Sequence, residues 1–240
     1  MVQRIITSSD ESPPPIRKLL RDVLDLPLIW TAPLLPMVRG KQVGQGVPVI
    51  VIPGLTSSDR STDRLVRSLN GAGFSACGWG QGINMGLRPG MLSGLEGLLT
   101  EASDLHAAKV VLVGWSLGGI FAREVAKLHP DRVRLVVTLG SPISGNRKSN
   151  NAWRIYEALN THTVENPPID SDLSQKPAVP TIALWSKRDG IVATASAQGK
   201  PHETDESIEI NSTHMGMTTR ARTISEIIRV LAERLAEQER

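Results

Sequence analysis

The residue whose surroundings most clearly indicate a chemical role is Ser116. It stands at the centre of the pentapeptide Gly-Trp-Ser-Leu-Gly at residues 114–118. This sequence matches G-x-S-x-G, in which a nucleophilic serine occupies a sharp turn between a strand and a helix. The apolar run at 109–113 predicts a buried strand before the turn, and residues 120–128 predict a helix after it. Such a turn strains the serine backbone and points its hydroxyl out of the sheet. Gly114 and Gly118 avoid collisions with the neighbouring strand and helix.

A serine hydroxyl needs a base within hydrogen-bond reach before it can attack a substrate. The chain has five histidines. His214 is the one that both follows a predicted strand, at 207–210, and comes last in the chain, as the order serine, acid, histidine requires. We therefore predict that His214 is the base. The competing histidines lie in or beside helices, in a polar insert or in a polar loop: His106, His129, His162 and His202.

The base in turn needs a carboxylate that fixes its tautomer and stabilises its protonated form. Asp189 follows the predicted strand at 181–185, and Gly190 after it suits a tight turn that presents the carboxylate. A turn-capping aspartate before glycine is the alternative interpretation. Asp170 and Asp172 are reserve candidates, although they follow no predicted strand. We predict that Asp189 is the acid.

Attack on a carbonyl also requires two backbone N–H groups that hold the developing oxyanion. The N–H of Leu117, directly after the serine, is the first expected donor. The second should lie in the loop after the strand at 47–52, where Gly54 lets the backbone approach closely and Leu55 is the expected donor. An ordinary Pro-Gly turn is the alternative for this loop. The hydroxyls of Thr56 and Ser57 are weaker candidates.

The elements that must position these residues alternate between strand and helix. This alternation predicts a mostly parallel sheet of about six strands with helices on both faces. The active site of such a sheet lies at the carboxyl ends of its strands, where all the candidate residues fall. Predicted strands span 47–52, 74–79, 109–113, 133–139, 181–185 and 207–210, and predicted helices span 16–26, 62–69, 91–107, 120–128, 152–159 and 223–239.

We expect residues 1–46 to form an N-terminal arm and an apolar, proline-rich helical segment. Residues 47–240 should form the catalytic domain, with a polar insert at about 143–178 in place of a large cap. The length of 240 residues and the hydrophobic content of 40% suit one globular domain with an ample core. The sequence gives no indication of the oligomeric state.

Composition excludes several function classes. The net charge is only +3 and the basic residues are scattered, which argues against a nucleic-acid partner. The single cysteine, Cys77, excludes an internal disulfide and a cysteine-based zinc site. Residues 1–7 lack the apolar segment of a signal peptide, and the prolines in 24–38 interrupt a stretch too short to span a bilayer. We expect a cytoplasmic protein without an integral membrane segment.

Together these residues resemble the α/β-hydrolase superfamily, and within it the bacterial lipase- and esterase-like serine hydrolases. The resemblance runs from about residue 47 to the C-terminus and is most specific at the serine turn and at residues 214–217. It implies Ser116 as nucleophile, Asp189 and His214 as its partners, a small-molecule ester as substrate, and no metal or organic cofactor. Serine at 116 argues against dehalogenase or epoxide hydrolase chemistry, which uses an aspartate there.

Two departures from this family stand out. Many relatives have His-Gly where this chain has Pro53 and Gly54, and many begin with an antiparallel strand pair that segment 16–39 replaces here. The same triad would also serve a thioesterase or an acyltransferase, and the fold supports ligand-binding proteins without turnover. Segment 24–38 is expected to cover the substrate pocket rather than to dock on a membrane, because its prolines break a regular amphipathic face.

For the substrate pocket, we single out large apolar side chains near the predicted sheet edge. The residues proposed as substrate contacts are Trp79, Trp115 and Met215. Further candidates for the pocket wall are Met85, Leu87, Trp153, Tyr156 and Met217. Residues of these types lie more often in a protein core than against a ligand.

Overall fold

A computed structural model describes residues 12–169 and 172–238. Its centre is a six-stranded sheet in the order β2-β1-β3-β4-β5-β6, and every neighbouring pair is parallel. The predicted fold class and strand number are therefore confirmed. The strands are β1 (Pro48–Ile52), β2 (Ser75–Gly78), β3 (Val110–Trp115), β4 (Val133–Leu139), β5 (Thr181–Trp185) and β6 (Glu206–Glu209).

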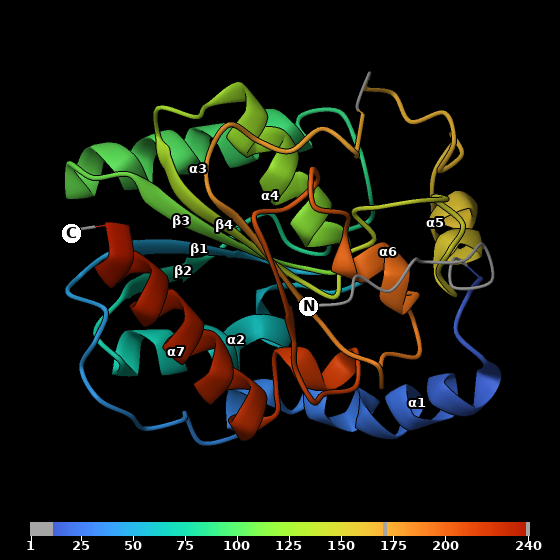
Figure 1. The fold of residues 1–240 in the computed structure, drawn as a ribbon, viewed down its shortest axis with the longest axis horizontal. Helices are drawn as coiled ribbons and strands as arrows, with labels where there is room; N and C mark the ends of the chain where they lie inside the picture. Colours follow the sequence, from blue (N-terminus) through green and yellow to red (C-terminus); the bar gives the residue numbers. More distant parts are fainter. Residues whose placement is uncertain (1–11, 170–171, 239–240) are drawn as a thin grey trace.

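Helices cover both faces of this sheet (Figure 1). On one face lie α3 (Met91–His106) and α4 (Leu117–Leu128), and on the other lie α1 (Ile16–Trp30), α2 (Asp59–Gly71) and α7 (Ala221–Gln238). The short α5 (Trp153–Leu159) and α6 (Thr194–Gln198) lie beyond the carboxyl ends of the strands. Two 3-10 turns, η2 (Ala32–Leu34) and η3 (Met215–Met217), complete the described elements. The sequence pattern did not predict α6, because one and a half helical turns carry too short a period.

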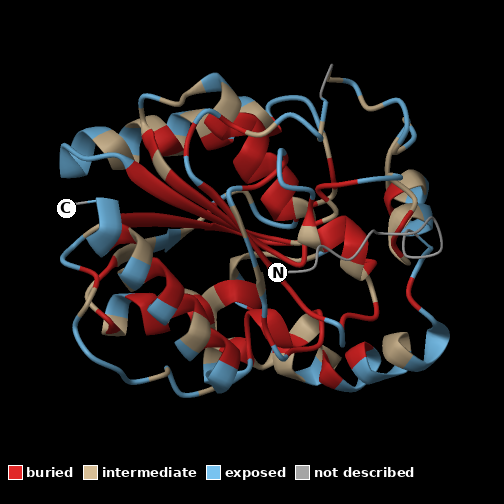
Figure 2. Ribbon diagram, viewed as in Figure 1, coloured by how far each residue is buried: buried red, intermediate tan, exposed pale blue. Residues whose placement is uncertain are grey.

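The sheet divides the core into two layers because successive strand residues point to opposite faces. Along β1, Val49 and Val51 pack toward α2 and α7, whereas Ile50 and Ile52 pack toward α3 and α4. The central strands are buried along their whole length (Figure 2). Burial on both faces explains their continuous runs of valine, isoleucine and leucine. This rigid platform holds the loops at its carboxyl edge.

Helix α1 differs from the sequence prediction in length. It continues through Pro27 to Trp30, four residues past the predicted end at residue 26. Proline lacks a backbone N–H and disfavours a helix interior. Here the chain continues into η2, where the N–H and the hydroxyl of Thr31 both donate to the carbonyl of Pro27.

The side chains of α1 also reverse the usual pattern of a surface helix, which buries apolar residues and exposes charged ones. Ile16, Leu20 and Leu24 are exposed, whereas Asp22 and Asp25 are buried. The inner face of this helix is thus acidic at two points and its outer face is largely apolar.

Within the described residues, no helix is both long and apolar enough to cross a bilayer.

Candidate active site

Ser116 occupies a sharp turn between β3 and α4. Its backbone angles are φ 55° and ψ −122°, a region that residues other than glycine rarely adopt. The turn is held because the Ser116 N–H donates to the carbonyl of Leu139 at 2.8 Å, and because flanking glycines allow close approach. A Cβ atom on Gly118 would lie 2.3 Å from the carbonyl oxygen of Ile52. The sequence therefore uses glycine where strand and helix backbones nearly touch.

This close approach predicts that Gly118→Ala is destabilising. The new methyl group would overlap the β1 backbone, so the free energy of unfolding should fall by about 1–3 kcal/mol or more. Gly97→Ala is the matched control, because a Cβ there meets nothing within 4 Å and alanine favours a helix. Urea denaturation should show a lower midpoint for the first variant and an equal or higher one for the second. Equal midpoints would contradict the steric argument.

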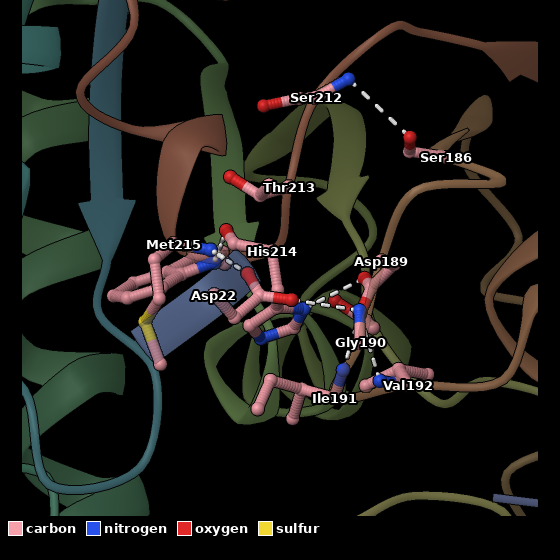
Figure 3. Close-up of polar contacts among 12 residues, drawn as sticks. Asp22, Ser186, Asp189, Gly190, Ile191, Val192, Ser212, Thr213, His214 and Met215 are labelled. Carbon is pink, nitrogen blue, oxygen red and sulfur yellow. Dashed lines mark hydrogen bonds and ion pairs between the residues drawn. The ribbon is translucent and has the colours of Figure 1, made fainter. Parts of the chain in front are cut away.

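His214 and Asp189 form a buried pair at the same sheet edge (Figure 3). The Nδ1 atom of His214 lies 2.7 Å from Oδ2 of Asp189, and both residues are at most 2% exposed. The other oxygen of Asp189 accepts the N–H groups of Ile191 and Val192, each at 2.8 Å. The carboxylate is therefore fixed by its own turn, with one oxygen left for the imidazole. A proton held on Nδ1 leaves Nε2 of His214 able to accept one.

Trp115 contacts His214 through both its indole N–H and its ring. Its indole N–H donates to the carbonyl of His214 at 3.1 Å, and the two ring centroids are 5.7 Å apart. Burial of His214 favours its neutral form, but the charge and hydrogen bond of Asp189, together with the charge of Asp22, raise its pKa above the usual value. Protonation of His214 is therefore easier than in water, as a base requires.

Asp22 was not singled out from the sequence, yet it connects the loops that carry the acid and the base. Its Oδ2 accepts the Gly190 N–H at 2.7 Å and its Oδ1 accepts the Met215 N–H at 2.9 Å (Figure 3). These two donors directly follow Asp189 and His214 in the chain. Burial raises the pKa of Asp22, while the His214 charge and both N–H groups act to lower it. The available signal was the spacing of two aspartates, one helical turn apart, in an otherwise apolar and basic helix.

Asp25, the second of these aspartates, holds the loop that carries His214 through the preceding residue, Thr213. It accepts the Thr213 hydroxyl and pairs with Nε and Nη2 of Arg220, with contacts of 2.8–3.1 Å to the guanidinium. Helix α1 also packs closely here, because a Cβ on Gly190 would lie 2.4 Å from the backbone of Lys18. Within the segment at 24–38 that was expected to cover the substrate pocket, Asp25 instead holds the loop before His214, and no residue of this segment lines the cavity beside Ser116.

The expected oxyanion loop follows β1. The N–H groups of Leu55 and Leu117 donate to no acceptor among the described residues, which leaves them available to a substrate. The loop is held by Asn84, a fully buried residue that the sequence reasoning missed. Its side-chain amide donates to the Pro53 carbonyl at 2.7 Å, and its own carbonyl accepts the Thr56 N–H at 2.7 Å. Thr56 has a positive φ of 60°, and its exposed hydroxyl bonds to its neighbouring carbonyl.

A cavity of about 100 Å³ opens beside Ser116, Leu117 and Leu55. Much of its wall comes from the insert, including Trp153 and Tyr156, and Leu87 also lines it. The three proposed substrate contacts do not line it. Trp79 and Trp115 are core residues with bonded indole groups, and Met215, the first residue of η3, packs against the core. Met85 and Met217 do not line it either.

The other predicted candidates lie elsewhere. His106, His129 and His162 contact Ser75, Glu96 and Tyr156 respectively, and His202 is a mainly exposed neighbour of Glu203. Asp172 bonds to Ser174 within the insert, and Asp170 lies outside the described residues. Within residues 12–169 and 172–238, no cluster of three or more histidine, cysteine or acidic side chains could hold a metal ion.

Known proteins share the fold of this chain. A sequence model described as the alpha/beta hydrolase fold matches residues 104–175, which include the Ser116 turn. An α/β hydrolase enzyme from the sediment metagenome of the Mar Chica lagoon, Morocco, superposes with a TM-score of 0.57 over 82% of this chain and 94% of its own, at 20% identity. The chain is an α/β-hydrolase-fold protein.

Other comparisons place this α/β-hydrolase-fold chain near esterases. An esterase of Pyrococcus furiosus superposes with a TM-score of 0.56 at 16% identity, covering 82% of this chain and 84% of the esterase. A 47-residue segment is 40% identical to the pimeloyl-[acyl-carrier protein] methyl ester esterase of Klebsiella pneumoniae (strain 342). That match spans 20% of this chain and about a fifth, 18%, of the esterase. At these identities and lengths the structural likeness establishes the fold.

Proposed function

We propose that this protein is a serine hydrolase that cleaves carboxylic esters through a Ser116 acyl-enzyme. One observation carries the proposal: the buried His214 contacts Asp189 at 2.7 Å at the sheet edge where the strained Ser116 turn lies. The fold and its esterase relatives support a hydrolytic reaction.

In the proposed reaction, Ser116 Oγ attacks the ester carbonyl carbon while His214 Nε2 takes the hydroxyl proton. The N–H groups of Leu55 and Leu117 hold the oxyanion. Collapse of the tetrahedral intermediate breaks the bond to the alkoxide, which leaves as the alcohol with the proton from His214. Water then attacks the acyl-enzyme with His214 again as base, releasing the carboxylic acid and free Ser116.

The cavity beside Ser116 supports a preference for short acyl groups. A volume of about 100 Å³, with a wall that includes Trp153 and Tyr156, suits acetyl to butyryl groups better than palmitoyl. Hydrolysis of p-nitrophenyl esters from acetate to palmitate tests this. We expect kcat/KM to peak at the short chains and to fall at least tenfold by palmitate. A peak at long chains would contradict the proposed pocket.

Covalent labelling tests the nucleophile independently of the ester chosen. A fluorophosphonate should modify Ser116, as located by peptide mass spectrometry, and His214→Ala should slow the labelling by several orders of magnitude. His202→Ala is the matched control, because that side chain is mainly exposed and lies in a loop before β6. Without labelling and without turnover of any ester or of a thioester such as butyryl-coenzyme A, the protein would be a binding module rather than a hydrolase.

A further inference from the structure

A second cavity, separate from the one at Ser116, lies behind the loop that carries His214. It has a volume of about 460 Å³ and is enclosed by the end of α1, the side of α2, the loops after β5 and β6, and the start of α7. Four arginines contribute to its wall: Arg64, Arg188, Arg220 and Arg222. Asp and Glu side chains do not contribute to the wall among the described residues. The cavity is thus strongly cationic.

Among the described residues, most of this positive charge lacks a compensating carboxylate. Arg220 pairs with Asp25, whereas the Arg188 guanidinium bonds to the Asn211 amide oxygen, at 3.3 Å. Arg64 donates to the backbone carbonyls of Pro36 and Thr219. Arg222 is exposed, with no hydrogen bond or ion pair from its side chain within the described part of the chain. Burial of Arg64, with the nearby Arg67 cation, lowers its pKa below the usual value.

The start of α7 also favours an anion in this cavity. The 18-residue helix α7 begins at Ala221 on the same wall, and the first N–H groups of a helix have no acceptor within it. Helix N-termini favour negative charge.

We propose that this cavity binds a phosphate-bearing small molecule. Guanidinium groups form paired hydrogen bonds to phosphate oxygens, and several arginines around one cavity suit a multiply charged anion better than a single carboxylate. The first N–H groups of α7 supply neutral donors beside them. This inference is independent of ester hydrolysis, because Ser116 lines the other cavity.

Isothermal titration with inorganic pyrophosphate at constant ionic strength tests the proposal. We expect one saturable site in the wild-type protein and at least a tenfold higher Kd in the double variant Arg188→Gln, Arg222→Gln. Both arginines are exposed, so the variant should keep its fold. The matched control is Arg17→Gln, Arg39→Gln, which removes the same charge away from the cavity and should bind within twofold of wild type.

The source of the phosphate is distinguished by a second titration with glycerol 3-phosphate. Binding comparable to pyrophosphate would assign the cavity to organic phosphate esters, and much weaker binding would assign it to inorganic or diphosphate groups. The proposal is overturned if pyrophosphate shows no saturable binding at millimolar concentration. It is also overturned if both double variants lose affinity equally, because net charge alone would then explain the binding.

Discussion

Ser116→Ala should lower kcat for ester hydrolysis by at least about four orders of magnitude while leaving the fold intact. Removing the nucleophile of a serine triad removes the acyl-enzyme route, and only the small acceleration from binding and the oxyanion donors persists. Replacement by alanine should also leave the packing around this position unchanged, because Ser116 is only partly buried beside the cavity. Initial rates with p-nitrophenyl butyrate measure the loss, and the melting temperature establishes that the variant is folded.

Ser141→Ala provides the matched control for this variant. Ser141 lies one residue beyond Gly140 at the end of β4, is fully buried, and has its hydroxyl 3.5 Å from the Gly114 carbonyl. It is a serine beside the same turn without a place in the proposed reaction. Its alanine variant should retain activity within about tenfold of wild type. Comparable losses in both variants would remove the basis for Ser116 as nucleophile.

Asp22→Asn should lower kcat/KM by up to about 100-fold and move the acidic limb of its pH profile. The asparagine can accept only one of the two N–H groups that Asp22 now accepts, so the loops of Asp189 and His214 lose a common anchor. A displacement of about 1 Å at a catalytic group can cost this much. Neutralising Asp22 also removes one of the charges that raise the pKa of His214.

The direction of the pH shift follows from the role of His214. As a base it acts only when neutral, so activity falls as the pH drops through its pKa. Asp189 and Asp22 are the two charged groups that raise this pKa in the folded protein. Loss of the Asp22 charge should therefore move the acidic limb to lower pH. The kcat/KM profile from pH 4.5 to 9 measures it.

Asp25→Asn is the control that separates the loss of a charge near His214 from the weakening of its loop. Asp25 lies one helical turn from Asp22, is also buried, and holds the same loop through Thr213 and Arg220, but it is not among the groups that shift the pKa of His214. This variant should lose stability and some activity with an unmoved acidic limb. If the limb moves equally in both variants, or in neither, Asp22 has no specific electrostatic influence on the base.

The sheet and the order of the candidate triad could be predicted because their signals are local. Each central strand is a short apolar run, and burial on both faces leaves no alternative for residues such as those at 110–113. Ser116 directly follows β3, Asp189 and His214 lie in the loops after β5 and β6, and parallel strands end at one edge. The contact of His214 with Asp189 therefore follows from topology.

The contacts of α1 could not be predicted in this way, because they depend on partners far along the chain. Helical periodicity groups Ile16, Leu20 and Leu24 on one side, but it does not say which side faces the protein. The burial of Asp22 depends on backbone N–H groups of two distant loops, which carry no side-chain signature. The continuation through Pro27 likewise depends on tertiary support rather than local propensity.

The substrate contacts could not be distinguished from the core for a similar reason. Trp79, Trp115 and Trp153 are the same residue type, yet the first two are buried in the core and the third lines the cavity. An apolar side chain satisfies either environment, and only the insert's position over Ser116 decides between them. Asn84 was missed because its role is to bond backbone groups inside a glycine-rich loop.

The hydrogen bonds that Asp22 in α1 makes to two distant loops also bear on the order in which the chain folds. Asp22 is separated by 168 residues from Gly190 and by 193 from Met215. Closing chain loops of that length is entropically costly, and it brings polar bonds rather than large apolar burial in return. The neighbouring strands β3 and β4 pair across a much shorter separation. We therefore expect the hydrophobic layers to form first, before the loops of Asp189 and His214 are held together by Asp22.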